Sequence, residues 1–175
     1  MADSETWRLQ VSLINAEPII DRRLGTVAAG LDDWSDVWPQ VAGWFYAMEE
    51  EQFKSEGRGA WSPLAPSTQR HRARHGFPVS HPILEETGRL IASLLGGEGH
   101  VRKETKTSIT LGTDLRVGAW NLGWLHEDGT AHMPARPPIG RGKKAGGIAL
   151  EPGDAKLLRI IFSEYVHTLV AGERA

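Results

Sequence analysis

The chain has 175 residues, of which 40% are hydrophobic and 24% charged, with a formal net charge of −2. This composition is typical of a globular protein and predicts a single domain over residues 1–175. The absence of cysteine excludes disulfides, thiolate metal sites and a cysteine nucleophile. The absence of cysteine also suits assembly in a reducing cytoplasm. The sequence has no apolar run of about 20 residues and no basic segment followed by an apolar one at its start, so we expect no membrane partner and no secretory signal.

The charge is unevenly distributed along the chain. Residues 1–56 hold 4 basic and 11 acidic residues, whereas residues 57–175 hold 16 basic and 11 acidic ones. Such a difference can orient subunits in an assembly or turn a basic surface toward DNA, and it can equally serve only to solvate the surface.

The first half of the chain predicts a strand and then helices. Trp7 to Leu13 alternates between apolar and polar residues, which is typical of a half-buried strand. Asp21 to Gly30 could form a short helical turn or a loop. Apolar residues at three- and four-residue steps predict a long helix from Val37 to Phe53, capped by Ser35 or Asp36 and ending near Gly57.

A proline-rich loop from Trp61 to Pro66 follows, and Ser67 could cap a short basic helix from Thr68 to His75. A second short helix is expected after Thr87, ending at Gly96-Gly97. His100 to Lys106 and Ser108 to Gly112 are candidates for a β-hairpin.

The last third is expected to be irregular before a final helix. Val117 to Leu125 could be a strand or a loop, and residues 137–147 form a glycine-rich loop that should be mobile in the free subunit. Asp154 can cap a helix with Leu157, Leu158, Ile161, Tyr165 and Leu169 on one face. The order predicts an α+β fold with a small antiparallel sheet packed against the long helix, short helices and a C-terminal helix.

The search for catalytic chemistry yields one weak candidate. His126 and His132 flank Glu127 and Asp128, and all four side chains are possible metal ligands. The six-residue spacing of the histidines matches no helical ligand pattern, and turn chemistry explains the segment better. We therefore expect no metal, no cofactor and no enzymatic activity, with a metal-dependent enzyme centred on His126 and His132 as the alternative.

Two further groups are candidates for binding. A basic surface could face phosphates without reading sequence, because no aromatic residues are interleaved with it; its members are Arg70, Arg72, Arg74, Arg136, Arg141, Lys143 and Lys144. Some of the seven tryptophans could anchor a subunit interface, although the sequence alone assigns none of them.

Four short landmarks lie in order between residues 53 and 140. They are an aromatic residue at Phe53 followed by Trp61-Ser62-Pro63-Leu64, then Ile83-Leu84-Glu85-Glu86-Thr87-Gly88-Arg89-Leu90, then Leu125-His126-Glu127-Asp128-Gly129, and last Pro134-Ala135-Arg136-Pro137. In this order and spacing the segment resembles the phage virion morphogenesis family, the tail completion proteins of Mu-like phages. The residues before position 35 and after Gly140 have no firm counterpart in that family, which also often has a Tyr-Ala pair where Gly118-Ala119-Trp120 stands.

The resemblance implies a structural protein of the virion, located at the neck or tail end. It would form a ring, six-fold in this expectation, that completes the tail or joins it to the head connector; a tail terminator or a head-side stopper is the alternative. Its partners would be other copies of itself, the neighbouring connector, tail-tube or terminator proteins, and DNA in the channel through non-specific contacts. Trp61 and Leu64 could plug a groove at an interface, Thr87 could cap a helix, and Arg136 could fix its loop by bonding carbonyls or a carboxylate.

Overall fold

The computed structural model describes residues 17–140, 143–144, 147–148 and 150–172, so the strand predicted at Trp7 to Leu13 lies outside the described residues. The helices are α1 (Glu17–Asp32), the 3-10 turn η1 (Ser35–Val37), α2 (Trp38–Lys54), α3 (Pro66–Arg74), α4 (Arg89–Leu94), α5 (Leu122–Asp128) and α6 (Pro152–Ala171). The strands are β1 (His100–Glu104), β2 (Ile109–Thr113), β3 (Arg116–Val117), β4 (Trp120–Asn121), β5 (Lys143–Lys144) and β6 (Gly147–Ile148).

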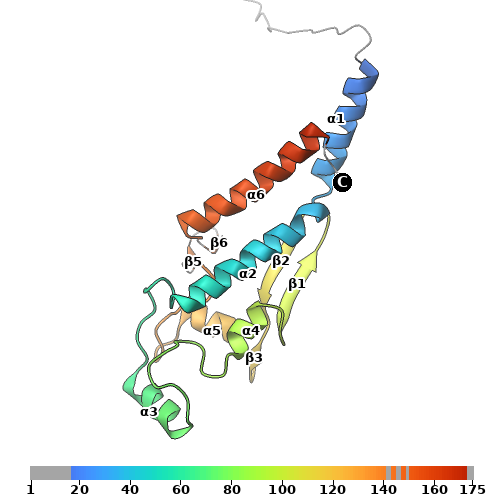
Figure 1. Ribbon diagram of the computed structural model, residues 1–175. Coiled ribbons are helices and arrows are strands. Elements are labelled where there is room, and N and C mark those ends of the chain that lie inside the picture. The colour runs from blue at the N-terminus through green and yellow to red at the C-terminus, as the bar shows by residue number, and fades with distance from the viewer. Residues whose placement is uncertain (1–16, 141–142, 145–146, 149, 173–175) are drawn as a thin grey trace, which may run out of the picture.

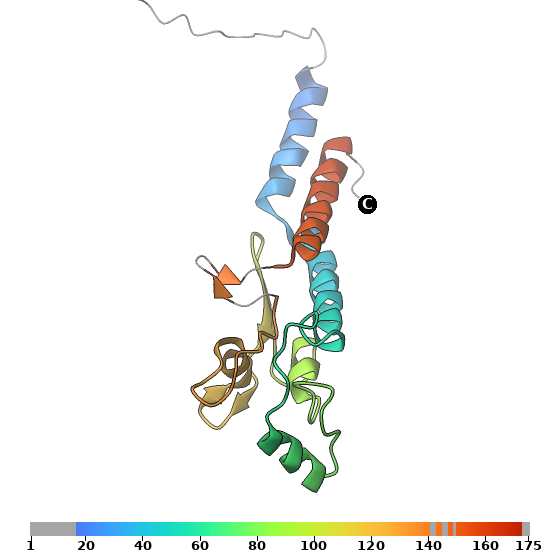
Figure 2. The ribbon, with the colours of Figure 1, turned by 90° about the vertical axis from the view of Figure 1, so that its left-hand side faces the viewer.

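Helix α2 forms the axis of an elongated molecule (Figure 1). The hairpin β1–β2 and the short helix α4 lie along one part of it, and α6 packs on α2 and on α1. Helix α3 lies at the end of the molecule opposite α1. In the turned view, α5 and the β3–β4 hairpin project to one side (Figure 2). The predicted α+β fold, with a small antiparallel sheet beside a long helix and a C-terminal helix, is confirmed.

The long helix α2 lies where the apolar spacing predicts it. Pro39 falls in its first turn, where a missing N–H costs no hydrogen bond. The predicted cap is wrong, because Ser35 and Asp36 form the preceding 3-10 turn and Val37 occupies the cap position without a side-chain hydrogen bond. The helix ends at Lys54, since Glu56 and the next residues turn through left-handed backbone conformations.

The predicted hairpin is also confirmed. Strands β1 and β2 are antiparallel, with Arg102 opposite Leu111 and Glu104 opposite Ile109. The Ser93 hydroxyl on α4 lies 2.8 Å from the Thr113 hydroxyl, which joins the short helix to the end of β2. The β3–β4 and β5–β6 pairs have only two residues in each strand and are separate from this sheet.

Two hydrophobic clusters share α2. The first contains Phe45, Met48, Phe53, Trp61, Leu64, Ile83, Leu90 and Leu94. The second contains Val37, Trp38, Val41, Tyr165 and Leu169. The first therefore joins α2 to the loops and α4, and the second joins α2 to α6. Burial of these side chains is the main favourable contribution to folding at both ends of α2.

Several sequence-based expectations need correction. Residues 17–32 form a full helix rather than a short turn, because α1 gains its stability by packing on α6. The segment after Val117 is a hairpin leading into α5, whose Asn121 accepts a hydrogen bond from the Trp124 N–H and so caps the helix. The helix after Thr87 begins with Gly88, in a left-handed conformation, at the cap position.

The C-terminal helix α6 has the predicted buried face, with one exception. Tyr165 and Leu169 are buried and Leu158 and Ile161 pack against their cluster, but Leu157 is 54% exposed. The cap position belongs to Glu151 rather than Asp154. No helix in the described part of the chain is long and apolar enough to cross a lipid bilayer.

Candidate functional site

The guanidinium of Arg136 joins two loops that are distant in sequence. Its Nε donates to the Ser62 carbonyl over 2.7 Å and its Nη2 donates to the Pro63 carbonyl over 2.8 Å. The Arg136 backbone N–H donates to the His126 carbonyl over 2.8 Å. The side chain is 5% exposed. The expectation that Arg136 fixes its loop by bonding carbonyls is therefore confirmed, and this buried side chain is not part of an exposed basic surface.

Trp61 fills the space beneath these loops. Its ring packs edge-on against Phe53 with centroids 5.3 Å apart, and its Nε1 donates to the Pro137 carbonyl over 3.1 Å. Trp61 and Leu64 are 6% and 8% exposed. The structure thus places both in the core of their own chain, where they plug a groove between its own loops and not one in a neighbouring subunit.

Arg72 likewise bonds backbone carbonyls of a neighbouring loop. Its Nη1 donates to the Pro82 carbonyl over 2.9 Å and to the Pro78 carbonyl over 3.3 Å, and its Nε lies 3.5 Å from a Glu86 carboxylate oxygen. It is 2% exposed, so the expected orientation toward DNA is wrong for this arginine. The reason is that the loop after α3 folds back over it and offers carbonyls that a guanidinium can satisfy.

Residues of the first two landmarks therefore share one hydrophobic core, and Arg136 of the last landmark bonds the first landmark through its side chain and the third, at His126, through its backbone N–H. We call this set the landmark cluster, and its members are Phe53, Trp61, Leu64, Ile83, Leu90, Leu94 and Arg136. All six of its apolar members belong to the first hydrophobic cluster. The Ile83 N–H also donates to the carboxylate of Glu56 over 2.9 Å, which ties the second landmark to the end of α2.

A cavity of about 230 Å³ lies beside the landmark cluster and is lined in part by Arg72, Glu86, His126 and Arg136. Burial and then the charge of Arg136 lower the pKa of His126 to about 4, so this imidazole is neutral at pH 7. Burial and then the charge of Arg72 lower the pKa of Arg136. Both guanidiniums at this cavity already bond carbonyls, and Arg72 also lies beside Glu86, so the charged groups here join loops of the same chain.

The histidine segment does not form a metal site in the described structure. His126 is half-buried and His132 is exposed. Among the residues that the structure describes, no group of three or more histidine, aspartate or glutamate side chains could hold a metal ion. The described geometry gives the metal-dependent alternative no support.

The basic residues do not form one surface. Arg70 and Arg74 are exposed on α3, at one end of the molecule, whereas Lys143 and Lys144 lie on β5, near the start of α6 (Figure 1). Arg141 lies outside the described residues. Phosphate contacts by this chain would therefore involve α3 and β5 as separate regions.

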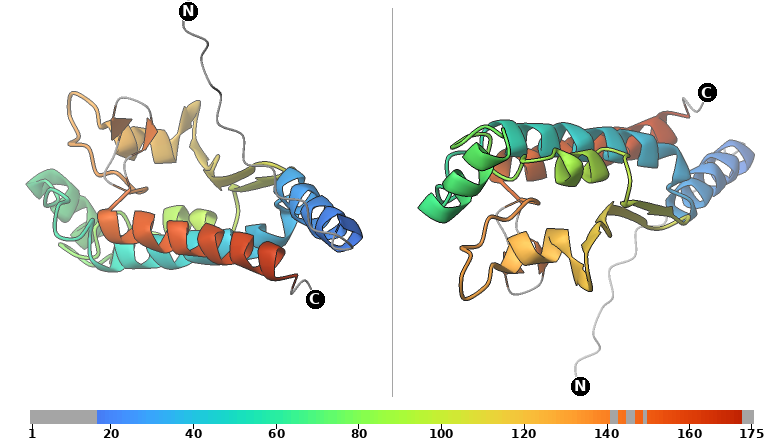
Figure 3. Two further views of the ribbon diagram at one scale, coloured as in Figure 1. Left: turned by 90° about the horizontal axis from the view of Figure 1, so that it is seen from above. Right: turned by 90° about the horizontal axis from the view of Figure 1, so that it is seen from below.

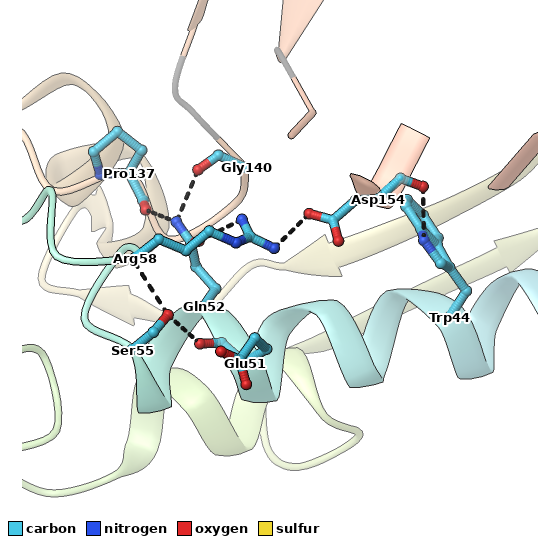
Figure 4. Close-up of polar contacts among 8 residues, drawn as sticks. All are labelled: Trp44, Glu51, Gln52, Ser55, Arg58, Pro137, Gly140 and Asp154. Carbon is cyan, nitrogen blue, oxygen red and sulfur yellow. Dashed lines mark hydrogen bonds and ion pairs between the residues drawn. The ribbon is translucent and has the colours of Figure 1, made fainter. Parts of the chain in front are cut away.

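A polar network fixes the first residues of the loop predicted at 137–147. The Gln52 amide donates to the carbonyls of Pro137, over 3.1 Å, and Gly140, over 2.8 Å (Figure 4). Arg58 donates to the Gln52 side chain over 3.2 Å and to the Asp154 carboxylate over 2.6 Å. Residues 137–140 are thus held on α2 and are not a free loop, and the network links the end of α2 to the start of α6.

Glu49 is a buried carboxyl group next to this network. It is 0% exposed, and neither carboxyl oxygen has a hydrogen-bond partner among the described residues. Burial, and then the neighbouring charges of Glu127 and Asp154, raise its pKa to about 9, although Arg58 opposes the shift. Glu49 is therefore protonated at neutral pH. No sequence signal distinguishes Glu49 from its neighbours Glu50 and Glu51.

The structure also shows an apolar surface that sequence reasoning did not assign. Trp120 is 68% exposed, Trp124 is 52% exposed and Val117 is 53% exposed. They lie on the β3–β4 hairpin and on α5. The sequence does show two tryptophans, Trp120 and Trp124, four residues apart. Because a strand or a loop was expected at this position, that spacing was not interpreted as a shared surface.

Comparison with known proteins adds no relative. No family model matches the chain, and no curated protein or solved structure matches it either.

Proposed function

We propose that this chain is a non-enzymatic structural subunit of a tailed-phage virion, assembled in the host cytoplasm and located at the neck or tail end. In this role it forms a ring of six copies that completes the tail or joins it to the head connector. Its other partners are the neighbouring connector and the tail-tube or terminator proteins.

The single observation that carries this proposal is the convergence of the landmark cluster. The landmarks are each short, and specific contacts between them are what one folded unit would have. In this chain residues of the first two landmarks share one hydrophobic core, and Arg136 of the last landmark bonds Ser62 and Pro63 of the first and His126 of the third. These contacts support the view that the chain resembles the tail completion proteins over one folded unit, and not only over separate short segments.

A tail terminator or head-side stopper is the second candidate, since it would occupy a neighbouring position in the same particle. The charge difference between residues 1–56 and the remainder suits any of these roles. A ring needs a heterologous interface, in which two different surfaces of the subunit meet.

Contact with DNA is a separate part of the proposal, and it rests on Arg70 and Arg74. We expect weak binding of double-stranded DNA that decreases with salt. The double variant Arg70→Glu with Arg74→Glu should bind less tightly and with a smaller salt slope, while Lys103→Glu, on an exposed residue of β1, should bind as the parent does. Equal binding by both variants would remove DNA contact by α3 from the proposal.

The decisive experiment is disruption of the gene in the phage or prophage that carries it. The expected result is that electron microscopy shows separate heads and tails, or incomplete tails, and that the chain supplied in trans restores joined particles. Intact infectious particles without the chain would overturn the proposal. The position of the labelled chain in restored particles would separate tail completion from the terminator and stopper roles.

A further inference from the structure

The cavity beside the landmark cluster has the features of a small binding pocket. Its volume of about 230 Å³ lies just below the range of about 300–1,000 Å³ that holds drug-sized ligands, so it suits a smaller molecule. Seen from below, α3 and the loop that follows α5 lie at the same end of the molecule, opposite α1 (Figure 3). The cavity is at this end, because α3, α5 and that loop all contribute to its lining.

Arg136 brings an uncompensated positive charge to this cavity. Its guanidinium donates to the neutral carbonyls of Ser62 and Pro63, and among the residues that the structure describes no carboxylate pairs with it. The side chain is 5% exposed, so water screens its charge little. Buried charges in proteins are usually paired, because an unpaired one loses its hydration without replacement. The cavity therefore borders a charge that a bound anion would compensate.

Arg72 adds a second buried guanidinium to the lining. It is 2% exposed, and its Nε–H has no hydrogen-bond partner within the described structure. Glu86 lies 3.5 Å from that Nε, and the charge of Arg72 also acts on Glu56. The acids near the cavity therefore compensate Arg72 and not Arg136. Burial and then the charge of Arg72 lower the pKa of Arg136, which shows that the two cations destabilise each other.

Much of the remaining lining is hydrocarbon, which we call the apolar wall. Its members are Leu84, Leu90, Leu122 and Met133. An inorganic anion such as phosphate would lose hydration against this wall, whereas a hydrocarbon group would gain from contact with it. An anion that carries a short hydrocarbon chain satisfies the guanidiniums and the wall together, and a small aliphatic carboxylate is the simplest molecule of this kind.

We infer that this cavity binds a small aliphatic carboxylate, with its charged group at Arg136 and Arg72 and its hydrocarbon chain against the apolar wall. The arginines keep their bonds to the loop carbonyls, so a bound carboxylate strengthens the junction between the loops that they join. The inference goes beyond the proposed function and does not depend on it.

Methionine methyl groups report binding directly. Met133 lines the cavity, whereas Met48 lies in the first hydrophobic cluster and serves as an internal control. The full-length chain, labelled with 13C at its methionine methyls, would be titrated with sodium butyrate at constant ionic strength and followed by NMR. The Met133 signal should shift and saturate while the Met48 signal stays in place.

Three other solutes test the class of ligand in the same titration. Sodium chloride and sodium phosphate supply anions without hydrocarbon, and butylammonium chloride has the hydrocarbon chain of butyrate with the opposite charge. None should shift the Met133 signal as tightly as butyrate does. Binding of any of them at least as tight as that of butyrate would overturn the inference, as would the lack of saturation by butyrate at about 50 mM.

Substitutions in the lining test the electrostatic argument and leave Arg136, whose loss is expected to destabilise the fold, in place. Glu86→Gln removes the acid beside Arg72 and should tighten butyrate binding about tenfold. Thr68→Glu places a carboxylate at the cavity, and it should bind butyrate about tenfold more weakly than Thr68→Gln, which has nearly the same size without the charge.

Thermal unfolding would confirm that each of these variants is folded before its titration. Equal affinities of Thr68→Glu and Thr68→Gln, or weaker binding by Glu86→Gln than by the parent, would show that the buried positive charges do not recognise the ligand and would overturn the inference. Neither outcome bears on the proposed function, whose test is the loss of joined particles.

Discussion

The Arg136 Nε and the Ser62 carbonyl oxygen are 2.7 Å apart, although the residues are separated by 74 positions in the sequence. Arg136 is almost completely buried, so the carbonyls it satisfies have little access to water. A buried acceptor that loses its donor costs far more than an exposed one. This contact is therefore the point at which the two proline-containing loops depend on each other.

Replacement of Arg136 should destabilise the fold strongly. We expect Arg136→Ala to lower the free energy of unfolding by about 2–4 kcal/mol, because the Ser62 and Pro63 carbonyls lose their donors. Arg136→Lys should recover only part of this, because a lysine keeps the charge but cannot donate as a fork. Urea denaturation measures both, with Arg70→Ala as the exposed control. Equal stability of the Lys variant and the parent would contradict the fork geometry.

Glu49 should make stability depend on pH. Its pKa rises from 4.5 to about 9 on folding, so the folded state binds the proton more tightly than the unfolded state does. Stability is then full below pH 4.5 and falls between pH 4.5 and 9, by at most about 1.4 kcal/mol per pH unit from this group. We expect Glu49→Gln to be more stable than the parent at pH 8 by about 2 kcal/mol or more, with a flatter profile.

The control for this experiment is Glu50→Gln, which removes an exposed carboxylate from the same helix. Thermal unfolding between pH 5 and pH 9 would be recorded for the parent and both variants. If Glu49→Gln and the parent lose stability in parallel over that range, Glu49 is not the group responsible.

Gly57 should be intolerant of a side chain because of Trp61. Both Gly57 and Gly59 have left-handed backbone, with φ of 68° and 77°. A Cβ at Gly57 would overlap the Trp61 ring, whereas a Cβ at Gly59 would meet nothing within 4 Å. We expect Gly59→Ala to cost about 1 kcal/mol from backbone strain alone, and Gly57→Ala to cost at least about 2 kcal/mol more. Chemical denaturation of the matched pair isolates the clash, and equal losses would contradict it.

The contact between α1 and α6 can be tested with two glycines of α1. A Cβ at Gly30 would lie 2.5 Å from a Leu169 methyl carbon, whereas one at Gly25 would meet nothing within 4 Å. Gly25→Ala should therefore stabilise the chain by about 0.5–1 kcal/mol through helix propensity. Gly30→Ala should destabilise it and increase proteolysis of α1. Stabilisation by both substitutions would show that α1 does not pack on α6 as described.

Periodicity predicted the elements whose stability is largely local. Helix α2 and the β1–β2 hairpin lie where the sequence indicates, because their apolar spacing is regular and extends over several turns or pairs. Helix α1 was missed because its helicity depends on packing against Leu169, a residue more than a hundred positions away. The predicted caps of α2, α4 and α6 are wrong. Each helix has a side chain near its start that could cap it, but a different residue occupies the cap position.

In the candidate site, too, some roles follow from the local sequence and others depend on residues far along the chain. That Arg136 bonds carbonyls was predicted from its place on a loop rich in proline, and the structure identifies these carbonyls as those of Ser62 and Pro63. A run such as Arg70, Arg72 and Arg74 reads as one basic face, yet α3 turns the middle arginine inward and the others outward. The partners that bury Arg72 come from the loop at Pro78 to Pro82, whose path no local pattern encodes.

The shared use of α2 by two separate clusters has a consequence for how this protein can vary. The landmark cluster rests on the C-terminal half of α2, while α6 rests on its N-terminal half through Trp38 and Val41, and α1 packs on α6. Substitutions in the second cluster can therefore accumulate without disturbing the first, provided that Asp154 at the start of α6 is kept as the partner of Arg58. A lineage could remodel its α1–α6 end to suit a new neighbour while keeping the loop-rich end unchanged, and a chimera that exchanges α1 and α6 but retains Asp154 should still fold.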